Sequence, residues 1–478
     1  MFSRVETRNT RTSRNLAPAE VGPWRSPDSR EFGVVCDMCR RDGHVAAGRP
    51  SASLTPDSPH PPRRGVDRCR TQVSQLVTPG AEPSRVAART PLKEQLIMFR
   101  RRILPQAALL LMLSACADSP TMVGDTDIAL RHAGGTHRVL STVRWTRQSI
   151  AFFRARGGNP ARNDVYLSLA QYRAARAALA EASGGIRPSP AGAVAGASVV
   201  VLKQFYPLDA AAIDAQLSAQ RADLPSGVTA DEFAMGESIG QAVARTVLAE
   251  AVTDNVGLTP PPPVPVGPGF WVSSGAPIVR GNYGARPFFL RSGSEIRLGP
   301  PPAFGSPTFS AALAEVRQIS DTRTAEQIAL TAKWVPFSSV VFNGIAADLI
   351  ERRHRSEVDA AEILAYANTA AFDAIIACFD TKFAYWYIRP TQADAGITLA
   401  TGLPNHPSYP SAHSCQSGAY HGVLSSAFPA DRRMIDSLAR EASLSRVVGG
   451  LHYRFDGDAG LALGGAAARL ALLRRGIE

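Results

Sequence analysis

Apolar residues recur at steps of three and four along most of the chain after Val139, and this spacing constrains the fold more than any other feature of the sequence. Such steps place apolar side chains on one face of an α-helix, whereas a half-buried strand alternates apolar and polar residues. No run of strand-like alternation is visible. The helical pattern is clearest in residues 165–182, 230–254, 310–317, 325–333, 344–353 and 356–385. The sequence therefore predicts an all-α protein, built as a helical bundle.

Residues 259–307 interrupt the helical pattern with prolines and glycines. The prolines lie at 260–263, 265, 268 and 300–302. Proline fixes φ and has no backbone N–H, so it cannot continue a helix interior. We expect a long irregular excursion here, inside one helical domain that spans residues 139–478. Excursions of this length within a domain are usually functional or wrap its surface.

An export signal is predicted near the N-terminus, in residues 98–116. It has a starting Met98, three arginines at 100–102, a short apolar run, and the ending Leu-Ser-Ala-Cys116. A charged start, a short apolar stretch and small residues before a cleavage point are typical of a secretory signal. The apolar run is shorter than the roughly 20 residues that span a bilayer. Its ending resembles the bacterial lipoprotein motif, which implies a lipid on Cys116, a tether over 117–138, and a membrane-anchored protein facing the periplasm or cell surface. The alternative is a short buried helix.

The segment before this signal, residues 1–97, is rich in Arg, Pro and Ser and has no sustained period, so it is expected to be a disordered leader. A signal peptide acts at an N-terminus, so we take Met98 as the true start and the leader as a mis-set gene start. Nine of the eleven net positive charges lie in residues 1–102. The basic balance therefore belongs to the leader and does not indicate nucleic-acid binding.

Cysteine usage does not predict a disulfide framework in the helical domain. Cys36 and Cys39 lie in the leader as a CxxC pair without the second pair that a zinc site needs. In the helical domain only Cys378 and Cys415 remain. We expect two buried thiols.

Three cations in two blocks of the sequence are the first sign of a chemical function. Lys382 and Arg389 are seven residues apart, which is two helical turns, so both are predicted on one face of a helix ended by Pro390. Arg446 follows in a later block. Cations that converge on one pocket repel unless an anion lies between them, and Arg suits oxyanions through paired donors. Ser411 and the backbone N–H groups near it could donate to the same anion. Taken alone, a Lys and an Arg at this spacing more often form a solvated face.

Histidines accompany the cations. His452 and Asp456 are four residues apart, one helical turn, so the carboxylate can hold one ring nitrogen and fix the tautomer. The other ring nitrogen is then free to act as a nucleophile or as a ligand. His413 is a candidate general acid–base. Each of these pieces is weak alone, and their joint occurrence in this order is what favours an enzyme site.

Three blocks of the sequence, 382–390, 410–413 and 445–456, resemble a signature. It is shared by vanadium-dependent haloperoxidases, bacterial acid phosphatases and lipid phosphate phosphatases, the type 2 phosphatidic acid phosphatase superfamily. The family pattern is K-x6-R-P, then P-S-G-H, then S-R-x5-H-x3-D. This chain fits each spacing through residue 456, with one departure: Ala412 stands where the family has Gly. Alanine keeps the backbone N–H, although glycine is often used where a ligand approaches closely.

The resemblance extends beyond the signature, to the bacterial haloperoxidase-related branch. The segments that carry it are 378–382, 405–409, Gly269-Phe270-Trp271, Arg286-Pro287-Phe288 and Pro300–Pro302, together with a long helical region before the signature. It implies that an oxyanion is held by Lys382, Arg389, Ser411, Ala412 through its backbone, and Arg446. It implies that His452 is the vanadium ligand or the phosphorylated nucleophile, that Asp456 orients it, and that His413 is the acid–base. Bromide-oxidising relatives tend to carry His at the position of His406, which makes it a candidate halide-site residue. The alternative is a loop residue beside Pro407.

Three functions fit this resemblance. The first is a vanadate-dependent haloperoxidase that oxidises halide, bromide or iodide being favoured, with hydrogen peroxide at a histidine-bound vanadate. The second is a phosphomonoesterase, an acid or lipid phosphate phosphatase, that needs no cofactor and works through a phospho-histidine. The third is a surface lipoprotein that binds an anion without turnover, for which Ala412 is the only argument.

Overall fold

The computed structural model of the chain describes residues 139–181, 185 and 187–477. All of them belong to one compact unit, Thr121–Glu478. The predicted leader, the signal 98–116 with Cys116, and the tether 117–138 lie outside the described residues.

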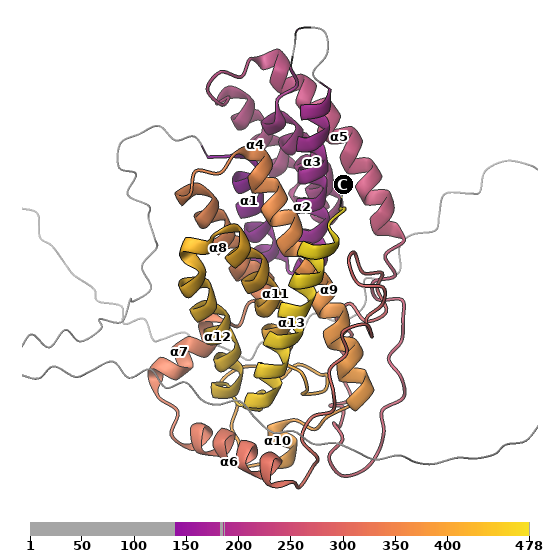
Figure 1. Ribbon diagram of the computed structural model, residues 1–478, viewed down its shortest axis with the longest axis vertical. Helices are drawn as coiled ribbons and strands as arrows, with labels where there is room; N and C mark the ends of the chain where they lie inside the picture. Colours follow the sequence, from indigo (N-terminus) through magenta and orange to yellow (C-terminus); the bar gives the residue numbers. More distant parts are fainter. Residues whose placement is uncertain (1–138, 182–184, 186, 478) are drawn as a thin grey trace, which may run out of the picture. The chain divides into compact units, whose positions relative to one another are not determined.

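The described residues form thirteen α-helices and no β-strand (Figure 1). An isolated antiparallel bridge joins Phe270 and Tyr387. The all-α prediction is therefore confirmed. The helices are α1 (Ser141–Arg156), α2 (Pro160–Ala180), α3 (Pro190–Phe205), α4 (Ala210–Ala222), α5 (Ala230–Val252), α6 (Pro307–Asp321), α7 (Ala325–Lys333), α8 (Ser338–Arg352), α9 (Glu357–Tyr385), α10 (Pro390–Ala393), α11 (Ala412–Ala427), α12 (Arg432–Val448) and α13 (Arg454–Arg474), with short 3₁₀ helices η1 (Pro207–Asp209) and η2 (Pro429–Asp431).

The predicted irregular excursion is present between α5 and α6. No helix forms between Val252 and Pro307. The excursion is fixed to the bundle by Asp373 of α9, whose carboxylate accepts three backbone N–H bonds from Phe288, Phe289 and Leu290 at 2.8, 2.7 and 3.0 Å. Asp373 is fully buried. Buried backbone N–H groups need acceptors, and this segment has no helix or strand to supply them. The carboxylate of Asp373 supplies them instead.

Helix α9 is the centre of the bundle and carries the first block of the signature. It is long and apolar enough to cross a membrane by length and composition, but 89% of its most apolar window is buried inside the protein. Its N-terminus is capped by Ser356, whose side chain accepts the backbone N–H of Asp359. Its first residue, Glu357, reaches across to the start of α1 and accepts the backbone N–H groups of Ser141 and Thr142 at 2.9 and 2.7 Å. Figure 1 shows α9 beside α11 and α13.

Helices α11 and α13 pack backbone to backbone, and this close approach brings the second and third blocks together. A Cβ on Gly464 of α13 would lie 2.0 Å from the carbonyl oxygen of Cys415 in α11. A Cβ on Gly460 would lie 2.7 Å from the carbonyl oxygen of Ser411. No side chain fits at either distance, so glycine is required at both positions. The second and third turns of α13 therefore lie directly against the first turn of α11.

The two cysteines of the bundle, Cys378 in α9 and Cys415 in α11, are buried free thiols. This agrees with the expectation from the sequence.

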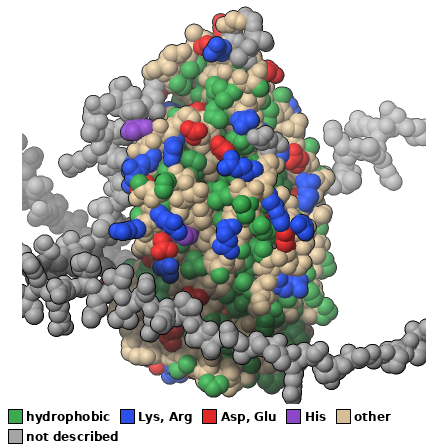
Figure 2. All heavy atoms as spheres, viewed as in Figure 1, with side chains coloured by type: hydrophobic (Ala, Val, Ile, Leu, Met, Phe, Trp, Pro, Cys, Tyr) green, Lys and Arg blue, Asp and Glu red, His purple; other side chains and the backbone are tan. Residues whose placement is uncertain are grey.

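On the face seen in Figure 2, Lys and Arg side chains lie among acidic and apolar ones.

Candidate active site

Lys382 and Arg389 meet, but not by the route that their spacing predicts. Helix α9 ends at Tyr385, and Trp386 adopts a left-handed conformation with φ 49°. The chain then runs extended to Arg389, which lies outside α9 with φ −82° and ψ 153°. The prediction that both cations share one helix face is therefore wrong. The left-handed residue turns the chain back, and this turn, instead of helical periodicity, brings Arg389 toward Lys382.

Both cations are fully buried and held by backbone carbonyl groups. The Lys382 amine donates to the carbonyl oxygens of Pro407 and Ser408, each at 2.8 Å. Arg389 donates through Nε to the carbonyl oxygen of His406 at 3.0 Å, and through Nη1 to that of Leu451 at 2.7 Å. These neutral acceptors orient the two side chains without neutralising their charge.

Arg446 supplies the third cation from the last turn of α12. Its Nε donates to the hydroxyl of Ser445 at 3.0 Å, and its Nη2 donates to the carbonyl oxygen of Thr331 in α7 at 3.2 Å. The side chain is nearly fully buried. Again the partners are uncharged.

His452 and Asp456 form the predicted pair, although not within a helical turn. Helix α13 begins at Arg454, so His452 precedes it and Asp456 lies in its first turn. The carboxylate Oδ2 accepts from Nδ1 of His452 at 2.9 Å and from the backbone N–H of Tyr453 at 3.2 Å. Nε2 of His452 lies 3.0 Å from Nη1 of Arg389. Because a guanidinium can only donate, the network assigns the proton of His452 to Nδ1 and a lone pair to Nε2.

The second block forms the start of α11. Ser411 is the N-cap and Ala412 is the first helical residue. The backbone N–H groups of a first helical turn have no partners within the helix and favour an anion. The backbone N–H of Ser411 itself is used, since it donates to the carbonyl oxygen of Asp456 at 2.9 Å. Donation to an anion from this block therefore falls to the Ser411 hydroxyl and the N–H of Ala412.

His413 points toward the connection between α7 and α8. Its Nε2 lies 3.3 Å from the carbonyl oxygen of Pro336, and its own carbonyl oxygen accepts from the hydroxyl of Ser338 at 3.1 Å. If Nε2 carries the proton that this carbonyl accepts, Nδ1 is the basic nitrogen. His413 is half-buried, in contrast to His452.

His406 contacts Arg389 on two sides. Besides its carbonyl oxygen, its ring Nδ1 lies 3.0 Å from Nη2 of Arg389. Nδ1 also lies 3.0 Å from the carbonyl oxygen of Pro407. A guanidinium can only donate and a carbonyl can only accept, so the contact with Arg389 needs a lone pair on Nδ1 and the contact with Pro407 needs a proton there. The ring also packs edge-on against Phe379, with centroids 5.2 Å apart. In this structure His406 orients Arg389.

Burial shifts every charged group at the site toward its neutral form. It lowers the pKa of Lys382 to about 8 and the pKa values of Arg389 and Arg446 to about 10. It raises the pKa of Asp456 to about 6. Desolvation penalises the charged state of each group. Three cations therefore face one carboxylate, and an oxyanion bound among them would offset the cost of their burial.

The histidines are neutral for the same reason. Burial, followed by the charge of Arg446, lowers the pKa of His413 to about 3. Burial and the nearby cations hold the pKa values of His406 and His452 well below their usual range. Each ring thus carries a lone pair at neutral pH, and that of His452 Nε2 faces Arg389 at 3.0 Å. An anion beside His413 would raise its pKa and let it hold a proton.

The sequence did not single out Ser408 as a site residue. Its hydroxyl donates to Oδ2 of Asp456 at 2.6 Å, and its carbonyl oxygen is one of the two acceptors of Lys382. It lies in the stretch 405–409, which resembles the bacterial haloperoxidase-related proteins. A serine at this spacing carries no signal of its own, because only the fold brings it to Asp456.

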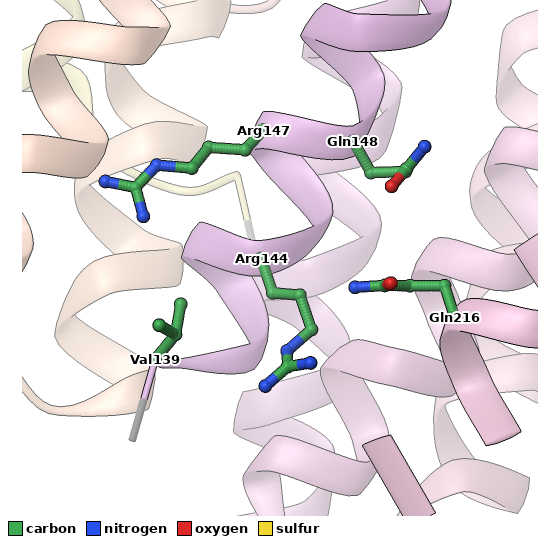
Figure 3. Close-up of a pocket in the computed structure, with 5 residues that line it drawn as sticks. All are labelled: Val139, Arg144, Arg147, Gln148 and Gln216. Carbon is green, nitrogen blue, oxygen red and sulfur yellow. The ribbon is translucent and has the colours of Figure 1, made fainter. Parts of the chain in front are cut away.

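Two surface hollows lie apart from these residues. One, of about 350 Å³, is lined by side chains of α1 and α4, including Arg144 and Gln216, with Val139 beside them (Figure 3). Its other arginine, Arg147, points away and pairs with Asp348 and Glu351 of α8. The second hollow lies over α11, α12 and α13, between His421 and Arg469. Neither contains any residue of the three blocks.

Residues 362–476 match the PAP2 superfamily, and this match covers all three blocks. This part of the chain belongs to that superfamily, as the signature predicted. Among solved structures, the chain is similar to a bacterial vanadium-dependent iodoperoxidase, with 19% identity, a TM-score of 0.60, and coverage of 71% of this chain and 97% of that chain. It is also similar to the apo-type of a bacterial vanadium-dependent chloroperoxidase, with 17% identity, a TM-score of 0.50, and coverage of 65% of this chain and 91% of that one. At identities this low, the structural similarity establishes a shared fold and nothing more.

A curated relative is the vanadium-dependent bromoperoxidase of Ascophyllum nodosum. It is 35% identical over 95 residues, which cover 14% of this chain. The chain spans only 17% of that relative's length. Residues 362–476 thus match the PAP2 superfamily, and the chain shares the fold of the vanadium-dependent peroxidases that it is similar to.

Proposed function

We propose that this protein is a vanadate-dependent haloperoxidase-like enzyme, which oxidises halide with hydrogen peroxide. The observation that carries the proposal is the charge balance of the site. Three buried cations, Lys382, Arg389 and Arg446, surround a neutral histidine and face one carboxylate. Such a set suits a compact oxyanion with several negative oxygens.

The donor set fits vanadate. Among the described residues, no group of three His, Cys, Asp or Glu side chains could hold a metal cation. A metal oxyanion instead needs positive donors around its oxygens and one lone pair for the metal. Lys382, Arg389, Arg446, the Ser411 hydroxyl and the N–H of Ala412 would supply the donors, and Nε2 of His452 the lone pair. When bound, vanadate would supply the activation of peroxide toward halide.

The remaining residues would control protons and orientation. Asp456 holds the Nδ1 proton of His452, which keeps Nε2 in its basic form. His413 would accept and return a proton through the ring nitrogen that does not face Pro336. The buried cations stabilise negative charge that develops on the reacting oxygens, without reorganising at the moment of reaction.

Bromide and iodide are the halides we propose. In the tautomer in which Nδ1 of His406 accepts from Arg389, Nε2 carries an N–H, and a halide needs such a donor. The small-molecule partners would then be hydrogen peroxide and halide. The fold supports a haloperoxidase over a phosphatase, because the similarity to the bacterial iodoperoxidase covers 71% of the chain and so extends beyond the three blocks.

A phosphomonoesterase is the second candidate. The observation that favours it is the extent of the PAP2 match, which covers only the oxyanion-binding part of the chain. The same residues would then hold a phosphate ester, His452 Nε2 would attack phosphorus, and His413 would protonate the leaving oxygen. No cofactor would be needed.

One pair of assays separates the two functions. The described domain, expressed from Val139 onward, is loaded with orthovanadate and tested for oxidation of iodide, bromide and chloride with hydrogen peroxide. Vanadate-free protein is tested on p-nitrophenyl phosphate. We expect iodide and bromide oxidation that depends on vanadate, with little ester hydrolysis. Rapid ester hydrolysis without halide oxidation would make the protein a phosphatase. Phosphate binding without either activity would make it a non-catalytic anion-binding protein, the reading that Ala412 favours.

We further propose that the protein is an exported lipoprotein, anchored to a membrane through Cys116. This proposal rests on the sequence of residues 98–116. Labelled palmitate should enter the protein expressed from Met98 in bacterial cells and should not enter its Cys116→Ser variant. Equal labelling of both proteins would exclude a lipid on Cys116.

A further inference from the structure

Ser408 joins two parts of the site that the signature treats as separate. It is fully buried. Its carbonyl oxygen accepts from the Lys382 amine at 2.8 Å, and its hydroxyl donates to Oδ2 of Asp456 at 2.6 Å. Its backbone N–H donates to the carbonyl oxygen of Tyr387 at 2.9 Å. All three polar groups of this residue are therefore engaged, and two of them engage side chains of the site.

All hydrogen bonds to the carboxylate of Asp456 go to one of its two oxygens. Oδ2 accepts from Ser408, from Nδ1 of His452 and from the backbone N–H of Tyr453. Oδ1 is buried and has no hydrogen-bond partner. Since an aspartate carboxyl group rotates easily about its last bond, the protein must hold Oδ2 toward His452 by other contacts. The short bond from Ser408 is the contact best placed to do so.

We propose that Ser408 is a positioning residue. Its hydroxyl fixes the carboxylate of Asp456, and the carboxylate in turn fixes the Nδ1–H tautomer of His452. Ser408 acts through Asp456 and does not bind the oxyanion. Its catalytic consequence rests on the proposed function, in which His452 Nε2 is the reacting nitrogen.

The test compares Ser408→Ala, which removes the hydroxyl, with Ser408→Thr, which keeps it. Residues that orient a ligating or reacting histidine typically contribute about 10- to 100-fold to activity. We expect Ser408→Ala to lower kcat about tenfold while KM and the affinity of the vanadate-free protein for inorganic phosphate change less than about twofold. Nitrogen NMR of His452 should show a new population protonated at Nε2. Ser408→Thr should restore both kcat and the Nδ1–H tautomer.

The matched control is Ser168→Ala in α2. Ser168 is also buried, but its hydroxyl donates only to carbonyl oxygens of its own helix, at 2.8 and 3.2 Å. Its loss should leave kcat and the His452 tautomer unchanged. If Ser408→Ala does not fold, Ser408→Cys, nearly isosteric and a weak donor, serves for the same measurements.

Two results would overturn the assignment. An unchanged His452 tautomer in Ser408→Ala would show that Asp456 holds its position without Ser408. A loss of phosphate affinity as large as the loss of kcat would show that Ser408 belongs to the anion-binding set. If the wild-type protein turns over neither halide nor ester, the proposed function fails, and the NMR measurement still decides the role of Ser408.

Discussion

Replacing His452 with alanine should abolish turnover in whichever assay the wild-type protein is active. Its Nε2 lies 3.0 Å from Arg389, within the group of buried cations, and its Nδ1 is held by Asp456 at 2.9 Å. Alanine removes the lone pair that would bind vanadium or attack phosphorus. Loss of a nucleophile or of the single protein ligand commonly costs about 10³-fold or more in kcat. Steady-state rates of halide oxidation and of p-nitrophenyl phosphate hydrolysis measure the effect.

Binding of inorganic phosphate should survive this change, because the cations contribute most of the attraction. Calorimetry of the His452→Ala protein should therefore give a phosphate affinity within about tenfold of the wild type. His421→Ala is the matched control, since His421 of α11 lies outside the three blocks and faces Asp436 at 3.6 Å. Its activity should equal that of the wild type. A His452→Ala protein that keeps more than a tenth of wild-type turnover would remove His452 from the reaction.

The sequence predicted which residues gather at the site better than it predicted how they gather. The intervals in the signature were interpreted as helical turns for Lys382 with Arg389 and for His452 with Asp456. In the structure each interval spans a helix end, and tertiary packing closes the contact. The roles of these residues remain predictions. The contacts of Ser408, and those of His406 with Arg389, depend on the position of loop 405–409 in the fold. The spacing of residues in the sequence does not predict that position.

The helical pattern of the sequence located some helices and passed over others. Helix α6, α7 and α9 were visible from their period. Helix α3 was not: Ala, Gly and Val follow one another through most of its length, and few polar residues mark a second face. Within the excursion, prolines and glycines predicted irregular structure but could not indicate the partner that holds it, Asp373.

Replacing Asp373 with alanine should destabilise the whole domain. Three backbone N–H groups, those of Phe288, Phe289 and Leu290, would lose their acceptor inside the protein. Each unsatisfied buried donor costs about 1–3 kcal/mol, so we expect a loss of about 3 kcal/mol or more in the free energy of unfolding. Urea unfolding followed by circular dichroism measures it. Asp373→Asn should be intermediate, since its amide keeps one acceptor oxygen but turns two donors toward other donors.

Asp380→Ala is a closely matched control, because Asp380 ties the same excursion to the same helix from the surface. It pairs with Arg297 at 2.6 Å, and the Arg297 side chain is 42% exposed. Exposed ion pairs contribute about 0–1 kcal/mol, so this variant should unfold nearly as the wild type does. Both side chains join the excursion to α9, but only Asp373 accepts hydrogen bonds from buried backbone N–H groups. Comparing the two variants therefore separates the loss of these acceptors from the loss of a link between the two segments. Equal effects from the two would mean that Asp373 acts as a surface tether does. A loss below about 1 kcal/mol for Asp373→Ala would mean that water or another group replaces the carboxylate, and the excursion would then not depend on Asp373 for its position.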